Sequence, residues 1–238
     1  MIKIQKFIYI ALALVLIYGC SKKNNDANFV LNGNVKGLKK GTLYLQRDGK
    51  RSLITIDSVI VDGNSNFTMS ANIKEPIIMY LRLHKKDGKE HYIPFFANKG
   101  VTEVNTTLKA FTNAKIKGSK QQELLNDYLK IMSDFNNQNL ELIKAKLEAT
   151  KQNDSLVLDS ILKRSNRLLK LKYASTINFA LNNNNSEVAP YLALYEIPDA
   201  NIKFLDSIYN KLTPEIKESL YGKRLGKALI DVKTTSNR

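Results

Sequence analysis

Two hydrophobic periods divide this chain near residue 118. Before that point, short runs rich in Val, Ile, Thr, Tyr and Phe recur about every ten residues, separated by Gly, Asn and Asp, which is typical of strands. Many short strands on one core indicate an antiparallel β-sandwich or a partly open barrel over residues 29–118. The predicted strands are 29–35, 41–47, 52–61, 66–72, 76–84, 91–97, 101–107 and 113–117.

Beyond residue 118 the apolar residues lie three or four apart, which predicts helices. A long helix is expected over 120–150, and a second follows a cap at 153–155. Residues 119–230 therefore form an α-helical region, residues 231–238 form a tail, and the fold class is α+β. The shorter helices are predicted at 186–195, 199–211 and 214–229.

The first predicted hairpin turns at Asp48-Gly49. A type I′ turn needs two positive φ angles, and Asp-Gly adopts them at little cost. With these two residues as the loop, Leu43 is expected to face Ile54 and Arg47 to face Lys50.

The N-terminus has the pattern of an export signal. Lys3 and Lys6 precede an apolar run over 7–18, and about a dozen apolar residues are too few for a permanent membrane helix, which needs roughly 20. The run ends in Ile17-Tyr18-Gly19-Cys20, which resembles the lipobox of bacterial lipoproteins. The resemblance implies that residues 1–19 are a signal peptide, that Cys20 carries acyl chains such as palmitate, and that residues 20–28 are a linker.

Cys20 is the only cysteine of the chain. A lone cysteine forms no internal disulfide, Cys-x-x-Cys redox pair or thiolate zinc cage. The sequence also shows no Gly-rich phosphate loop and no recognisable Ser, His and Asp set. We therefore expect a protein that is not an enzyme and that needs no cofactor.

The chain is basic, with a formal net charge of +15 that falls to +13 when the signal peptide with Lys3 and Lys6 is removed. For an exported protein the available anions are lipid head groups and acidic glycans, and nucleic acid is a poor candidate. Two hairpin tips would form one anionic-surface patch if they point the same way, and would otherwise be solvated turns. Their basic residues are Arg47, Lys50, Arg51, Lys85, Lys86 and Lys89.

His84 and His91 are the only histidines. With Asp87-Gly88 as a two-residue loop, the two side chains are expected to lie side by side. A paired imidazole binds a metal weakly, but two histidines without a placed carboxylate make an incomplete site. The alternative is that both are ordinary strand residues at a loop end.

Several segments together resemble a known bacterial family. The β-region segments 29–35, 41–45, 57–59 and 63–67 resemble the DUF4369-type opening domain of membrane-anchored thiol:disulfide interchange lipoproteins of Bacteroidota. The helical segments 184–192, 209–215 and 219–223 resemble the region that precedes the thioredoxin-like domain of that family. The chain stops before such a domain, so the resemblance implies only the non-catalytic, membrane-proximal part.

These observations favour a lipid-anchored envelope protein that acts as a binding or scaffolding module, with a separate thioredoxin-like protein as the candidate partner. One alternative is a truncated relic of an oxidoreductase, and another is a module that binds acidic glycan or lipid through the basic tips. Ser21 follows Cys20 where some bacteria place an aspartate that retains lipoproteins at the inner membrane. This favours a periplasm-facing position on the inner leaflet of the outer membrane over the inner membrane.

Overall fold

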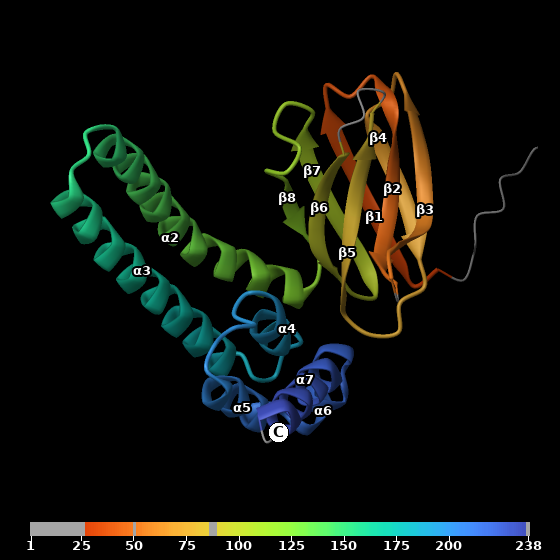
Figure 1. Cartoon of the computed structure of the whole chain (residues 1–238). Coiled ribbons are helices and arrows are strands. Elements are labelled where there is room, and N and C mark those ends of the chain that lie inside the picture. Colours follow the sequence, from red (N-terminus) through yellow and green to blue (C-terminus); the bar gives the residue numbers. More distant parts are fainter. Residues whose placement is uncertain (1–26, 50, 86–89, 237–238) are drawn as a thin grey trace, which may run out of the picture.

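The computed structural model describes residues 27–49, 51–85 and 90–236 (Figure 1). The strands are β1 (Phe29–Lys36), β2 (Lys40–Asp48), β3 (Leu53–Asp62), β4 (Asn66–Ala71), β5 (Ile77–His84), β6 (Glu90–Ala97), β7 (Gly100–Thr107) and β8 (Lys115–Lys117). The helices are α2 (Lys120–Lys151), α3 (Ser155–Asn182), α4 (Val188–Tyr195), α5 (Ile202–Lys211), α6 (Pro214–Glu218) and α7 (Leu220–Ser236). The predicted α+β class, with strands first and helices after, is confirmed.

The strands form two four-stranded sheets with the orders β4-β1-β7-β8 and β3-β2-β5-β6. Alternate residues of each strand point between the sheets, so Leu31, Leu43, Leu81 and Phe95 are fully buried in a shared core. This is the expected sandwich, and it is not closed into a barrel. One pairing differs from the antiparallel expectation, because β1 and β7 run parallel.

The register predicted for the first hairpin is wrong. Arg47 lies opposite Ile54 and Leu43 opposite Val59, with a bulge between Leu45 and Gln46. The loop is longer than two residues, and the Gly49 N–H closes it by donating to the Ser52 carbonyl at 3.0 Å. The longer loop allows β2 and β3 to pair along their whole lengths, and it leaves Val61 buried in the core while Ile54 and Ile60 are exposed.

Helices α2 and α3 form a long antiparallel hairpin, here called the arm, that projects away from the sandwich (Figure 1). The side chain of Ser119 accepts from the Gln122 N–H to cap α2, and Asp154 accepts from the Val157 N–H to cap α3. Far from the sandwich, the two helices pack on each other through a small cluster of Leu142, Ala149 and Ile161.

The four shorter helices pack at the base of the arm. The predicted helix over 214–229 is in fact two helices, because Ser219 between α6 and α7 has extended backbone angles of φ −66° and ψ 165°. Its hydroxyl accepts from the Gly222 N–H at 3.2 Å and so caps α7, which runs to Ser236 and into the predicted tail. Over the described residues, no helix is both long and apolar enough to cross a bilayer.

Candidate functional site

The helices meet the sandwich along one buried contact, here called the seam. Ile78 of β5 and Phe96 of β6 point outward from their sheet and are covered by Tyr128, Leu192 and Tyr221 from three helices. All five side chains are at most 3% exposed. The seam is therefore a second core that joins the two parts of the chain.

Hydrogen bonds at the seam satisfy a backbone N–H group at the sheet edge and another at the start of α7. The Phe96 N–H, on the edge strand β6, donates to Oε1 of Gln122 at 2.7 Å. The Leu220 N–H, at the start of α7, donates to Oε2 of Glu75 at 2.6 Å. Since buried backbone groups need partners, these side chains fix the orientation of the helices on the sheet.

Tyrosines surround the seam. The ring of Tyr221 lies edge-on to those of Phe96, Tyr191 and Tyr195, at centroid distances of 6.0, 5.4 and 6.2 Å. Burial raises the pKa values of Tyr128, Tyr191 and Tyr221, because a phenolate would lose its hydration there. The hydroxyls are therefore neutral hydrogen-bonding groups at physiological pH.

Tyr80 lies beside this cluster and is half-buried. Burial, followed by the charge of Asp48 and its hydrogen bond, raises the pKa of Tyr80 to about 12. Asp48 also faces Arg224, at 3.7 Å, and Arg224 donates to the Tyr195 hydroxyl at 2.8 Å. This chain of contacts ties α7 and α4 to the end of β2.

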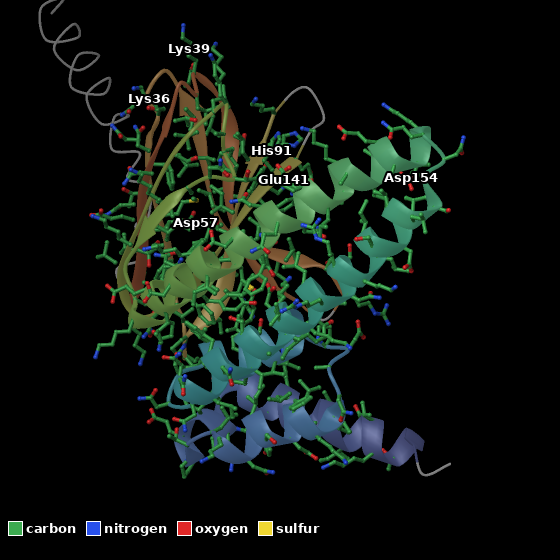
Figure 2. The ribbon with its side chains drawn as sticks, turned by 90° about the vertical axis from the view of Figure 1, so that its left-hand side faces the viewer. Lys36, Lys39, Asp57, His91, Glu141 and Asp154 are labelled. Carbon is green, nitrogen blue, oxygen red and sulfur yellow. The ribbon has the colours of Figure 1, made fainter. Side chains whose placement is uncertain are left out.

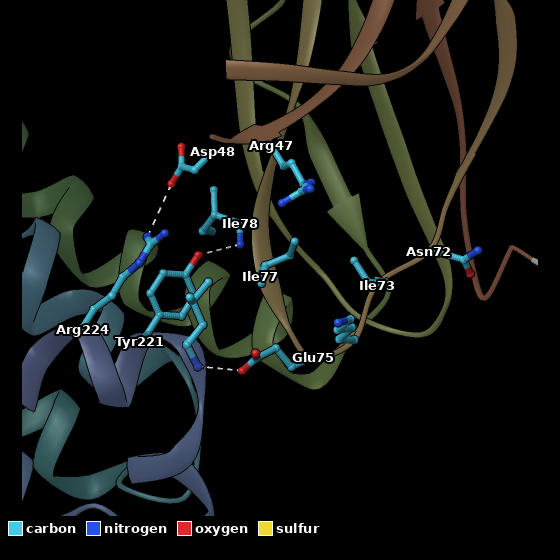
Figure 3. Close-up of a pocket in the computed structure, with 11 residues that line it drawn as sticks. Arg47, Asp48, Asn72, Ile73, Glu75, Ile77, Ile78, Tyr221 and Arg224 are labelled. Carbon is cyan, nitrogen blue, oxygen red and sulfur yellow. Dashed lines mark hydrogen bonds and ion pairs between the residues drawn. The ribbon is translucent and has the colours of Figure 1, made fainter. Parts of the chain in front are cut away.

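A hollow of about 360 Å³ opens beside these contacts (Figure 3). Its walls come from the end of β2, the start of β5 and the first turn of α7. The carboxylates Asp48 and Glu75 already bond to α7, whereas the side chains of Arg47 and Lys74 on the rim have no ion-pair partner within the described chain. The rim of the hollow therefore carries two cationic side chains that are not neutralised by described residues.

The predicted basic patch does not form. Since β2 and β5 are antiparallel, with Arg47 opposite Met79 and Thr42 opposite His84, their hairpin turns lie at opposite ends of the sheet. Arg47 and Arg51 thus lie at the seam end, and Lys85 at the far end. Lys50, Lys86 and Lys89, as well as the lipidation candidate Cys20, fall outside the described residues.

The predicted pairing of the histidines is also wrong. His84 lies opposite Glu90, and His91 lies opposite Leu83. Five residues separate His84 from Glu90, so the register shifts by one and the two imidazoles point to opposite faces. The His91 ring lies 6.3 Å from that of Phe111 at the core edge. Among the described residues, no group of three or more His, Cys, Asp and Glu side chains could hold a metal ion.

Sequence reasoning missed the residues that lock the seam. No local pattern predicts a structural role for Gln122, Glu75 or Arg224, because their partners are distant in the chain. The pair Tyr221-Gly222 could have been noticed: a Cβ on Gly222 would lie 1.9 Å from the Ile216 carbonyl, so glycine is needed for α6 and α7 to approach.

Comparison with known proteins supports the sequence resemblance for the β region. Residues 29–125 match the family model described as Domain of unknown function (DUF4369). The match covers the whole sandwich and the first turn of α2, and so includes Gln122 of the seam. No curated protein and no solved structure matches the chain. The sandwich and the first turn of α2 are therefore a DUF4369 domain, to which the remaining helices of this chain are joined.

Proposed function

We propose that this protein is a lipid-anchored, non-catalytic binding or scaffolding module of a bacterial cell envelope. The observation that carries the proposal is the arm. It is held in a fixed direction by the seam, yet it exposes large apolar side chains: Leu140, Leu147, Leu156 and Leu162 are 61%, 60%, 84% and 59% exposed. Leu140 and Leu147 lie seven residues apart on α2 and so share one helix face, and an apolar face that is exposed in this way supports a protein-binding role.

The proposed partner is a separately exported thioredoxin-like protein, which would supply the domain that the resembling lipoproteins carry in the same chain. The arm supports this choice because, among the described residues, its distal half packs on itself and leaves apolar side chains exposed on both helices. In this proposal the reactive thiols belong to the partner, and this chain positions it at the membrane.

Site-specific photocrosslinking in native membranes tests the partner. A photoreactive amino acid at Leu147 is expected to crosslink to a thioredoxin-like protein that carries Cys-x-x-Cys. The matched control is Ile60, an exposed apolar residue of the sandwich at 80% exposure, which is expected to give no such product. If Leu147 gives no protein product and a deletion strain has no envelope phenotype, the chain is a relic and the proposal fails.

The anchor is tested separately at Cys20. Because two or more acyl chains hold a protein stably on a bilayer, Cys20→Ala is expected to abolish labelling by an alkyne fatty acid and to release the protein from the membrane fraction. Density-gradient separation of the wild type is expected to place it with the outer membrane. Continued labelling of the alanine variant would contradict the assignment.

A further inference from the structure

The end of the sandwich opposite the seam is unusually basic. Strand β1 ends at Lys36, the turn after it holds Lys39, β2 starts at Lys40, β5 is followed by Lys85, and β7 is followed by Lys109. The strand registers bring these turns together: Lys36 lies opposite Thr107 and Thr42 lies opposite His84. We call the five lysines the basic end, and Figure 2 shows Lys36 and Lys39 at its tip.

Most of this charge is not neutralised. The described residues of these turns include two acidic side chains: Asp62, which lies 3.6 Å from Lys40, and Glu90, which pairs with Arg82. The Lys40–Asp62 pair is highly exposed, so it is weak. Within the part of the chain that the structure describes, the other four lysines of the basic end have no ion-pair partner.

Neutral polar groups surround the lysines. The turn between β3 and β4 reaches the basic end because Gly63, at φ +86°, donates its N–H to the Lys39 carbonyl at 2.8 Å. Its exposed residues Asn64 and Asn66 carry amide groups, and the Asn34 side chain donates to Ser65 Oγ at 2.9 Å. Amides and hydroxyls of this kind can bond to the hydroxyls of a sugar.

The basic end is the end of β1 farther from the proposed anchor. The described chain enters β1 at Phe29, on the seam end, whereas Lys36 ends β1. Eight residues at about 3.3 Å each separate the two ends by roughly 25 Å. In the proposed envelope location the lipid anchor precedes Phe29 in the sequence, so it is joined to the sandwich at the end opposite the basic end.

From this arrangement we infer that the basic end binds an anionic polysaccharide that carries carboxylate or phosphate groups. The inference rests on the proposed envelope location and names a ligand class for the binding module. The unpaired ammonium groups attract the anions, the neighbouring amides bond to the sugar hydroxyls, and the position opposite the anchor favours a polymer over the surface of the protein's own bilayer.

The test uses the whole mature chain with Cys20→Ser and measures binding to immobilised polygalacturonate, with neutral dextran as the control polymer. The variant K36E/K39E/K109E reverses three exposed lysines of the basic end. Its matched control K130E/K144E/K146E makes the same charge change on exposed positions of α2. Thermal unfolding should be the same for both, since all six side chains are exposed.

The wild type is expected to bind polygalacturonate but not dextran, with affinity falling as salt rises because the Debye length is only about 10 Å at 0.1 M. The basic-end variant should lose at least tenfold in affinity, and the α2 variant less than twofold.

Equal losses of affinity in the two variants would assign binding to net charge alone and overturn the inference. Binding to anionic phosphatidylglycerol vesicles without binding to polygalacturonate would overturn it in favour of a bilayer. Photocrosslinking from Leu147 does not involve the lysines of the basic end. Failure of polysaccharide binding can therefore be distinguished from failure of the proposed function.

Discussion

The hydroxyl oxygen of Tyr221 accepts a hydrogen bond from the Ile78 backbone N–H at 2.8 Å, which joins residues 143 positions apart (Figure 3). The pairing of β2 with β5 stops at Met79, one residue after Ile78. Beyond this point β2 offers no carbonyl acceptor to β5, and the Tyr221 hydroxyl supplies one instead. This hydrogen bond joins α7 to the sheet.

Removal of this hydroxyl tests how far the seam stabilises the fold. Tyr221→Phe keeps the ring but leaves the buried Ile78 N–H without a partner, so the free energy of unfolding should fall by about 1–3 kcal/mol. Tyr209→Phe is the control, because that residue is half-buried and the change keeps its ring, over which the Lys217 ammonium lies at 5.5 Å from the centroid. Equal urea midpoints for the two variants would show that the hydrogen bond contributes little.

Alkaline pH should unfold the protein through its tyrosines. The pKa of Tyr80 is raised to about 12, and burial raises those of Tyr128, Tyr191 and Tyr221 as well. The pKa values of these tyrosines in the folded state exceed the value of about 10 in the unfolded state, so the unfolded chain loses these protons at lower pH. The contribution of these groups to stability is thus complete below pH 10 and is lost as the pH rises through 12 and beyond.

Urea unfolding followed from pH 8 to 12, together with tyrosinate absorbance, measures this effect. The fall in the free energy of unfolding above pH 10 should be smaller in Tyr221→Phe, because this variant lacks one of the tyrosines whose pKa is raised. Ionisation of all tyrosines near pH 10 without loss of structure would contradict the buried seam.

Gly222 should tolerate no side chain. Its Cβ would lie 1.9 Å from the Ile216 carbonyl oxygen and 2.7 Å from that of Lys217, and backbone atoms cannot rotate away. Gly222→Ala is expected to cost about 3 kcal/mol or more in unfolding free energy. Gly226→Ala, one turn later, meets the movable ring of Tyr209 at 2.9–3.0 Å and should cost clearly less. Thermal unfolding of both variants provides the comparison, and a near-neutral Gly222→Ala would show that α6 can shift.

The histidines should give no shared metal site. Because His84 and His91 point to opposite faces of the β5–β6 pair, they cannot ligate one ion together. A zinc titration followed by thermal unfolding should therefore give the same response in the wild type and in His84→Ala. Stabilisation by zinc that disappears in His84→Ala would require a different register at this hairpin.

The sequence predicts the strands and the long helices well, because alternation and 3.6-residue periodicity reflect burial directly. Strand β6 is expected at 91–97 and found at Glu90–Ala97, and α2 is expected at 120–150 and found at Lys120–Lys151. The break at Ser219 is missed, because Ser219 sits between two apolar stretches that share a helical period and its capping role depends on the fold.

Tertiary arrangement accounts for the remaining differences. An Asp-Gly pair favours a turn but does not fix the loop length, and one extra or missing residue moves a side chain such as His91 to the other face. The basic end is missed for a related reason: Lys36 ends β1 and Lys109 follows β7, and the local pattern does not reveal that these two strands pair in parallel.

The length of the arm sets how far from the sandwich a bound partner would lie. Helix α2 has 32 residues, and at about 1.5 Å per residue it is about 48 Å long. If, as proposed, the chain is tethered to a membrane and binds a partner near the tip of the arm, the partner would be confined to a layer above the bilayer, where its effective concentration toward substrates would be higher. Equal deletions in α2 and α3 would then change the height of that layer without altering the seam.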